Sequence, residues 1–142
     1  MTTVRHLLSR KQSALFTVAP EESVLQAVRA MAERHVGALL VMRGEELAGI
    51  VSERDYARKV ILLGRSSPET PVSRIMSSPV VTVSPDTSVQ QCMTLVTEKR
   101  IRHLPVMEAG RVIGIISIGD LVKSVIEEQQ RTIEQLETYI HG

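Results

Sequence analysis

Two copies of one short pattern decide how this chain is organised. The sequence Gly-Ile-Val-Ser-Glu-Arg-Asp occupies residues 49–55, and Gly-Ile-Ile-Ser-Ile-Gly-Asp occupies residues 114–120. Outward from this pattern, a shift of 65 residues lays residues 18–58 on residues 83–123 without a gap. A match of this length predicts that one supersecondary unit has been duplicated.

Each copy predicts the same order of elements, β-α-β-β-α. The first strands are expected at residues 15–18 and 80–83. The helices that follow start with capping boxes, Ser23 with Gln26 and Ser88 with Gln91, in which a hydroxyl and an amide satisfy backbone N–H groups. Paired apolar runs then predict hairpins at 38–42 with 47–51 and at 104–107 with 112–116. A second helix follows Ser52 and Ser117.

The predicted fold class is therefore α/β, with tandem repeats packed about a pseudo-twofold axis. One repeat cannot cover both faces of a three-stranded sheet, so pairing of the repeats is expected. The predicted boundaries are residues 1–63 for the first repeat, 64–71 for a polar linker and 72–142 for the second repeat, all within one compact module. A looser copy, residues 4–8 against 72–76, extends the match upstream.

A long helix is predicted after Asp120, and it extends further than its counterpart in the first copy. Its apolar positions alternate in steps of four and three, the period of a heptad seam: Val122, Ile126, Gln129, Ile133, Leu136 and Ile140. Two interpretations remain open. The helix packs back on its own domain, or it pairs with a second copy in a homodimer, where Gln129 would suit register selection.

Composition argues against several classes of function. Seventeen basic and sixteen acidic residues nearly cancel, so no global field draws the chain to nucleic acid or to a membrane surface. The chain has three aromatic residues, Phe16, Tyr56 and Tyr139. These are too few for a protein that binds single-stranded nucleic acid by stacking bases on aromatic side chains. A single cysteine, Cys92, and the lack of an apolar leader predict a cytoplasmic location. No apolar run is long enough to span a bilayer.

The Ser-x-x-Asp end of each copy is the strongest candidate for a binding site: Ser52 with Asp55, and Ser117 with Asp120. Alone, this spacing is typical of a capping box, which is a structural role. A helix start also presents free N–H groups and a positive dipole end, and a carboxylate there can accept both hydroxyls of a ribose. The duplication favours binding, because a twofold arrangement would turn both corners towards the crevice between the units.

The chain resembles the CBS-domain family, whose tandem pairs form Bateman modules. The resemblance covers nearly the whole chain. It rests on the Gly-apolar-x-Ser-x-x-Asp ends, the Ile-Arg-His-Leu-Pro-Val run at 101–106 with its partner at 36–41, Ile75-Met76, and the Pro-x-x-Ser-Val helix starts. In that family such pairs bind AMP, ADP, ATP, NAD or S-adenosylmethionine. The resemblance implies a regulatory adenine-nucleotide sensor with no catalytic cofactor, not an enzyme.

The resemblance also implies roles for individual residues. In one site Ser117 and Asp120 hold the ribose, Phe16, Val36 and Ala38 line the base, and Arg102 and His103 meet phosphate. In the twin site these roles fall to Ser52 and Asp55, to Val81 and Ile101, and to Arg54 and Arg58, with Met76 near adenine and Lys11 as a weaker candidate. Gly37-Ala38 replaces Arg102-His103 in the first copy, and Leu40 stands where the second has Pro105. The two sites are therefore expected to differ in affinity or in ligand.

Two other classes of function are weighed against this one. An enzyme would need a nucleophile beside a base, a metal cluster or a Gly-rich phosphate loop, and none is readable here. A structural or nucleic-acid-binding adaptor could act through the C-terminal helix or the basic run at 99–102. His103 has an alternative as an ordinary histidine, while His6, His35 and His141 are expected at the surface, and Cys92 in the core.

Overall fold

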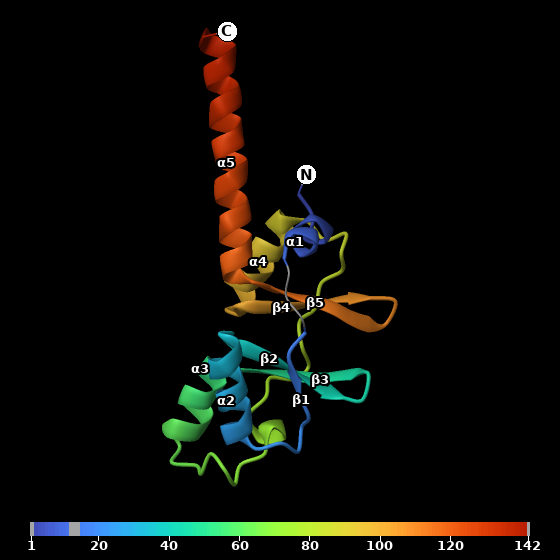
Figure 1. Ribbon diagram of the computed structural model, residues 1–142, viewed down its shortest axis with the longest axis vertical. Coiled ribbons are helices and arrows are strands. Elements are labelled where there is room, and N and C mark those ends of the chain that lie inside the picture. The colour runs from blue at the N-terminus through green and yellow to red at the C-terminus, as the bar shows by residue number, and fades with distance from the viewer. Residues whose placement is uncertain (1, 12–14, 142) are drawn as a thin grey trace. The chain divides into compact units, whose positions relative to one another are not determined.

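The computed structural model describes residues 2–11 and 15–141. It divides into two compact units, each described separately below (Figure 1). Unit 1 comprises residues 2–11, 82–108 and 113–141, and unit 2 comprises residues 15–81 and 109–112. The packing units thus differ from the sequence boundaries, since part of each unit comes from the other side of the linker.

Unit 2 holds a three-stranded sheet in the order β1-β2-β3. Its strands are β1 (Thr17–Val18), β2 (Ala38–Arg43) and β3 (Glu46–Ser52), with β1 parallel and β3 antiparallel to β2. Its helices are α2 (Val24–Arg34), α3 (Glu53–Tyr56), the π-helix η1 (Ala57–Ile61) and the 3-10 helix η2 (Val72–Arg74). The buried core of this unit lies between α2, the sheet and η2.

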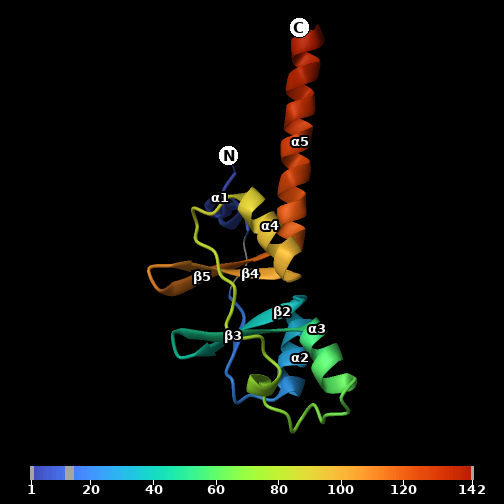
Figure 2. The ribbon, with the colours of Figure 1, turned by 180° about the vertical axis from the view of Figure 1, so that it is seen from behind.

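Unit 1 is built on β4 (His103–Glu108) and on residues 113–117 of β5 (Arg111–Ser117), two strands seen from the opposite side in Figure 2. Its helices are α1 (Val4–Arg10), α4 (Val89–Lys99) and α5 (Ile118–His141). Fully buried side chains from all of these elements form its core, among them Val4, Cys92, Leu104, Ile116 and Leu121. The expectation that Cys92 is a core residue is confirmed, and burial raises the pKa of its thiol.

The predicted capping boxes are confirmed at the starts of α2 and α4. The Ser23 hydroxyl accepts from the Gln26 N–H at 3.2 Å, and the Gln26 amide oxygen accepts from the Ser23 N–H at 3.2 Å. Ser88 and Gln91 make the same exchange at 3.1 and 3.0 Å. Each box fixes where its helix begins, which places the buried stripe of the helix over the sheet.

The strand predicted at residues 80–83 is reduced to one parallel bridge at Val83. In unit 2, the Leu40 N–H donates to the Phe16 carbonyl oxygen at 3.2 Å and extends the equivalent pairing. Pro105 stands at the position of Leu40 in the second repeat, and proline has no N–H to donate. The pairing in unit 1 is therefore shorter.

The segments that lead into the two repeats are exchanged between the units. Helix α1 precedes the first repeat but packs in unit 1, where the Val4 N–H donates to the Thr87 carbonyl oxygen at 2.9 Å. Helix η2 precedes the second repeat but packs in unit 2, where the Val72 N–H donates to the Glu22 carbonyl oxygen at 2.8 Å. The loose upstream match in the sequence therefore marks equivalent segments, each packed against the opposite repeat.

The glycine that opens each copy of the repeated pattern lies where an exchanged segment comes close. A Cβ on Gly49 would lie 2.7 Å from Met76 Sδ and 3.0 Å from the Ser77 carbonyl oxygen. A Cβ on Gly114 would lie 2.5 Å from a methyl carbon of Leu8. At Gly49 the backbone of the neighbouring segment occupies part of the space of a side chain, whereas at Gly114 the flexible end of the Leu8 side chain occupies it.

Candidate functional site

The corner of unit 1 forms where β5 ends and α5 begins. The Ser117 N–H donates to Asp120 Oδ2 at 2.8 Å, and the Asp120 N–H donates to Ser117 Oγ at 3.2 Å. The reciprocal pair closes the first turn of α5 and holds the Asp120 carboxylate at the helix start. The structural interpretation of the Ser-x-x-Asp pattern is thus correct, and it fixes the carboxylate in place for a ligand as well.

Lys11, which directly follows α1, is the cation of this corner. Its Nζ donates to Asp120 Oδ2 at 2.7 Å and to the Ile115 carbonyl oxygen at 2.9 Å. The Lys11 ammonium and the Ser117 N–H both donate to the same oxygen of Asp120, Oδ2. The Asp120 side chain is 29% exposed. Its second oxygen, Oδ1, is therefore placed to accept hydrogen bonds from a bound molecule.

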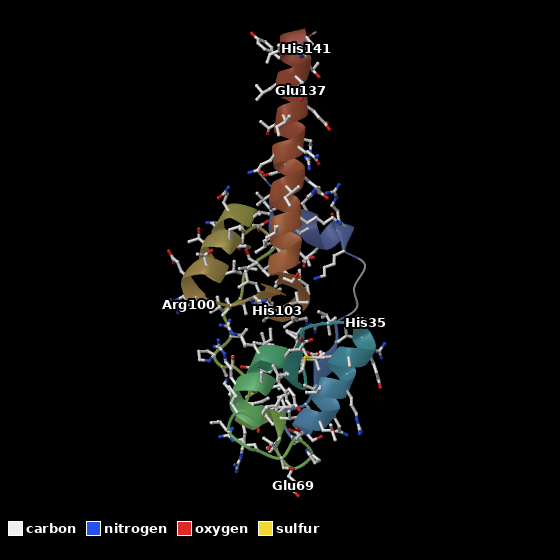
Figure 3. The ribbon with its side chains drawn as sticks, turned by 90° about the vertical axis from the view of Figure 1, so that its left-hand side faces the viewer. His35, Glu69, Arg100, His103, Glu137 and His141 are labelled. Carbon is white, nitrogen blue, oxygen red and sulfur yellow. The ribbon has the colours of Figure 1, made fainter. Side chains whose placement is uncertain are left out.

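Electrostatic coupling joins His103 to the same group of residues. Burial lowers the pKa of His103, and the positive charges of Lys11 and Arg102 lower it further, whereas Asp120 acts to raise it. Burial alone would raise the pKa of Asp120, but hydrogen bonds from Lys11 and Ser117 outweigh burial, and that pKa is lowered. Figure 3 shows His103 beside the start of α5. The corner thus combines a charged carboxylate, the Lys11 cation and a half-buried imidazole on which the charge of Arg102 also acts.

The corner of unit 2 has the same capping box but a more completely bonded carboxylate. Asp55 Oδ2 accepts from the Ser52 N–H at 2.9 Å and from the Ser52 hydroxyl at 3.0 Å. Asp55 Oδ1 lies 3.1 Å from Lys59 Nζ and accepts from the Ser77 hydroxyl at 3.4 Å. The Asp55 side chain is 12% exposed. A ligand at this corner would have to replace bonds that the protein already makes.

The helix starts offer fewer N–H groups than the sequence suggested. The Ile118 N–H donates to the Arg102 carbonyl oxygen at 2.9 Å, and the Glu53 N–H donates to the Gly37 carbonyl oxygen at 3.0 Å. A further N–H in each helix is used by its capping box. The expectation of free N–H groups was wrong at these positions, because the backbone before each hairpin satisfies them. Attraction of an anion there must come mainly from side chains.

The structure brings only part of the predicted set together. Five of the predicted residues belong to unit 1, at or next to its corner: Ser117, Asp120, Arg102, His103 and Lys11. Ser52, Asp55 and Met76 lie around β3 of unit 2, with Arg54 and Arg58 exposed on α3 and η1. Phe16, Val36 and Ala38 also belong to unit 2, whereas Val81 and Ile101 lie in different units.

Sequence reasoning missed one cation and placed another only loosely. Lys59 was not proposed, although it stands four residues after Asp55 on one helix, a spacing that brings opposite charges together. Lys11 was a weak candidate, and the structure places it on Asp120. No spacing could have predicted that contact, because it depends on the exchange of α1 into unit 1.

The expected surface histidines are confirmed, since His6, His35 and His141 are exposed. Within residues 2–11 and 15–141, no group of three or more His, Cys, Asp or Glu side chains is arranged to hold a metal ion. An open groove of about 600 Å³ lies elsewhere in unit 1, lined by Thr82, Val83, Ser84, Thr87, Gln91, Thr94, Leu95 and Met107. It contains none of the predicted site residues.

Comparison with known proteins identifies the family. The model of the CBS domain matches residues 4–62 and again residues 72–127. The chain therefore belongs to the CBS-domain family and carries a tandem pair of these domains, which are regulatory modules. The resemblance drawn from the repeated pattern is confirmed.

Two curated relatives show how this pair occurs elsewhere. The mitochondrial CBS domain-containing protein CBSX3 of Arabidopsis thaliana is 45% identical over 127 residues, which cover 86% of this chain and 62% of the relative. The CBS domain-containing protein YhcV of Bacillus subtilis is 33% identical over 105 residues, covering 74% of each chain. The chain thus spans less than two thirds of the length of CBSX3.

Solved structures match the fold closely. A protein from Burkholderia ambifaria, described as a proposed signal-transduction protein with CBS domains, is 52% identical with a TM-score of 0.87, covering 90% of this chain and 96% of its own. The hexameric CBS-CP12 protein from bloom-forming cyanobacteria is 30% identical with a TM-score of 0.77, covering 86% of this chain and 70% of its own. In the part of the chain described, no helix has the length and apolarity needed to cross a membrane.

Proposed function

We propose that this CBS pair is a regulatory sensor that binds adenine nucleotides, with AMP, ADP, ATP and NAD as the candidate ligands. The observation that supports this function best is the corner of unit 1. There the Asp120 carboxylate is fixed by its capping box and paired with Lys11, while the charges of Asp120, Lys11 and Arg102 all act on the neighbouring His103.

A nucleotide fits the chemistry of this corner because it carries both neutral donors and negative charge. Ribose hydroxyls can donate to Asp120 Oδ1, and phosphate oxygens can accept from Arg102, whose planar fork matches them. Phosphate also favours the protonated form of His103 and offers Lys11 a second anionic partner. A carboxylate beside several cationic groups therefore suits a ligand with a ribose next to phosphate.

The corner of unit 2 is proposed as a weaker site. Asp55 would hold the ribose, but its oxygens already bind Ser52, Lys59 and Ser77. The base-lining and phosphate roles assigned to the remaining predicted residues stay predictions. So do the choice among nucleotides and the number of sites that fill.

The test is a thermal-shift panel with AMP, ADP, ATP and NAD at millimolar concentration. The panel uses the wild type and the variants Asp120→Ala, Asp55→Ala and Asp86→Ala, the last being an exposed aspartate that pairs with Arg5. A ligand at about a hundred times its Kd should raise the Tm of the wild type by roughly 8 °C. We expect Asp86→Ala to keep this shift and Asp120→Ala to lose most of it.

If no nucleotide raises the Tm of the wild type, the sensor function is rejected. If the chain instead bound nucleic acid with a steep salt dependence, the adaptor function would replace it.

We also propose that the chain acts as a homodimer. Helix α5 carries large apolar side chains that unit 1 leaves exposed, and the hexameric CBS-CP12 protein shows that a related CBS protein assembles. A cytoplasmic location stays a prediction, since the relative CBSX3 is named as mitochondrial.

A further inference from the structure

Helix α5 presents a continuous seam, defined here as Val122, Ile126, Gln129, Ile133, Leu136 and Ile140. The steps between these residues alternate between four and three, as in a heptad repeat. All six are exposed, with 54% exposure at Ile126, 53% at Ile133 and 56% at Leu136. The expectation that the helix packs back on its own domain is wrong for its C-terminal half, because residues 129–141 are exposed throughout.

Unit 1 holds α5 by the face opposite the seam. Leu121 and Ser124 are buried, Glu127 pairs with Arg10 at 2.6 Å, and Glu128 accepts a hydrogen bond from Thr2. With the seam at heptad positions a and d, these four residues of α5 fall at positions b, c and f, the outer positions of a coiled coil. The contacts of the unit and the seam therefore use different faces of the same helix.

Among the described residues of unit 1, no other helix or strand lies beside the last turns of α5. Figures 1 and 2 show the helix continuing past α1 and α4, and Figure 3 labels Glu137 and His141 on this projecting part. An isolated helix with an apolar stripe gains little stability in water without a partner for that stripe. The seam is therefore an exposed apolar stripe that the described residues of unit 1 do not cover.

We propose that the seam pairs with the seam of a second copy of this chain in a parallel, in-register coiled coil. This inference rests on the proposed homodimer and adds its surface and orientation. Ile126, Ile133 and Ile140 occupy the a positions, and Val122, Gln129 and Leu136 the d positions. Isoleucine at all three a positions, with leucine at one d position, is compatible with a two-stranded parallel coiled coil.

Gln129 decides the orientation. In the parallel arrangement its amide meets Gln129 of the partner subunit, and the two amides can bond to each other. An antiparallel arrangement that pairs all six seam positions would instead set Gln129 against Ile133 of the partner subunit. The amide would then be enclosed by an apolar side chain and lose hydrogen bonds, which is a costly loss.

Flanking charges do not overturn this choice. The antiparallel arrangement would bring Lys123 near Glu137 of the partner subunit, but an exposed ion pair contributes little. In the parallel arrangement the flanking pairs join Val125 to Gln130 and Thr132 to Glu137, so like charges do not meet. The parallel form satisfies the buried amide and gives up only a weak surface pair.

The first test compares Ile133→Lys, on the seam, with Gln135→Lys, which adds the same charge to the outer face two residues away. Light scattering coupled to size exclusion gives the mass, and circular dichroism confirms folding of each variant. We expect Ile133→Lys to halve the mass of the assembly and Gln135→Lys to leave it unchanged. A protein that associates with a micromolar Kd is mostly assembled at about 100 μM. A wild type that is monomeric at this concentration would overturn the proposal. An unchanged mass for Ile133→Lys would overturn it as well.

The second test reads the orientation in a Cys92→Ala background, since Ala27 occupies that position in the first repeat. Leu136→Cys alone should form an intermolecular disulfide on mild oxidation. In the antiparallel form it would not, and a mixture of Ile126→Cys and Leu136→Cys chains would cross-link only with each other. That second outcome rejects the parallel arrangement while leaving self-association intact.

The nucleotide panel is repeated on Ile133→Lys. A retained thermal shift separates sensing from pairing, so that failure of one proposal does not count against the other.

Discussion

The two Ser/Asp corners share one sequence pattern and the same capping box, yet they are completed differently. In unit 2 both oxygens of Asp55 are bonded and the side chain is 12% exposed. In unit 1 the Lys11 ammonium and the Ser117 N–H share one oxygen of Asp120, and the side chain is 29% exposed. The comparison teaches that duplication preserved the scaffold of the corner while allowing one carboxylate to be used mainly for stability and the other to remain accessible.

The counter-ions of the two carboxylates show the same divergence. Lys59 comes from the helix of Asp55 itself, four residues on, whereas the equivalent position after Asp120 is the buried Ser124. Lys11 takes its place from the segment after α1. Each carboxylate is thus neutralised, but by residues from unrelated positions in the repeat.

The largest expected difference between the corners is in stability. Asp55→Ala should reduce the free energy of unfolding by about 2–3 kcal/mol, because it removes the carboxylate half of the capping box and leaves Lys59 without its ion-pair partner. Asp120→Ala should cost about 1 kcal/mol, since its surroundings are more exposed. Urea unfolding measures both, with Asp86→Ala as a control expected within about 0.5 kcal/mol of the wild type. Equal losses at the two corners would remove the distinction between them.

Replacing the glycine that opens each copy of the pattern should produce a smaller difference in stability between the two units. Gly49→Ala places a Cβ against the Ser77 carbonyl oxygen as well as the Met76 side chain, and we expect a loss of about 2 kcal/mol. Gly114→Ala meets only the flexible end of Leu8, which can move, so a loss under about 1 kcal/mol is expected. Thermal unfolding followed by circular dichroism checks the order, and a larger loss at Gly114 would contradict the packing described.

The smallest expected effect is a pH dependence confined to unit 1. The lowered pKa of His103 leaves it neutral at pH 7.5, and a bound phosphate would favour its protonated form. Nucleotide affinity should therefore rise as pH falls, by at most about ten-fold per pH unit for one proton. Calorimetric titrations between about pH 8 and 5.5 cover the range in which histidine side chains titrate. They should show this rise in affinity for the wild type and an affinity independent of pH for His103→Gln.

The unliganded protein should show the opposite trend. Because the pKa of His103 is lower in the folded state than the ordinary value of 6.5, its contribution to stability is fully present above that value. It is lost as pH falls through and below 6.5, since the unfolded chain then binds the proton more readily. Stability that increased on acidification through this range would show that His103 is not buried as described.

Much of the fold followed from local sequence signals. The 65-residue repeat, the capping boxes and the hairpins depend on neighbours in the chain, and all were predicted. The shortened strand before Ser84 could have been inferred too, because Pro105 cannot donate the bond that Leu40 makes. The exchange of α1 and η2 between units could not, since it depends on contacts between segments remote in sequence.

The candidate site was predictable to the same extent. The Ser/Asp corners, Arg102 and His103 were placed by the repeat and by resemblance. Lys59 was missed despite a readable spacing, and the pairing of Lys11 with Asp120 follows only from the exchanged helix. The two carboxylates differ in how fully they are hydrogen-bonded, and this difference depends on three-dimensional packing. The Ser-x-x-Asp pattern is the same in both repeats, so the sequence pattern does not predict it.

The central claim is that the corner of unit 1 is the stronger nucleotide site, and calorimetric titration of ATP tests it most directly. Asp120→Asn and Asp55→Asn keep the size of the side chain and remove its charge. The account predicts that Asp120→Asn weakens the tightest binding at least about ten-fold, as expected for loss of charge-assisted hydrogen bonds, while Asp55→Asn changes it less than about two-fold. Loss of the tight binding in Asp55→Asn, with Asp120→Asn unaffected, would contradict it.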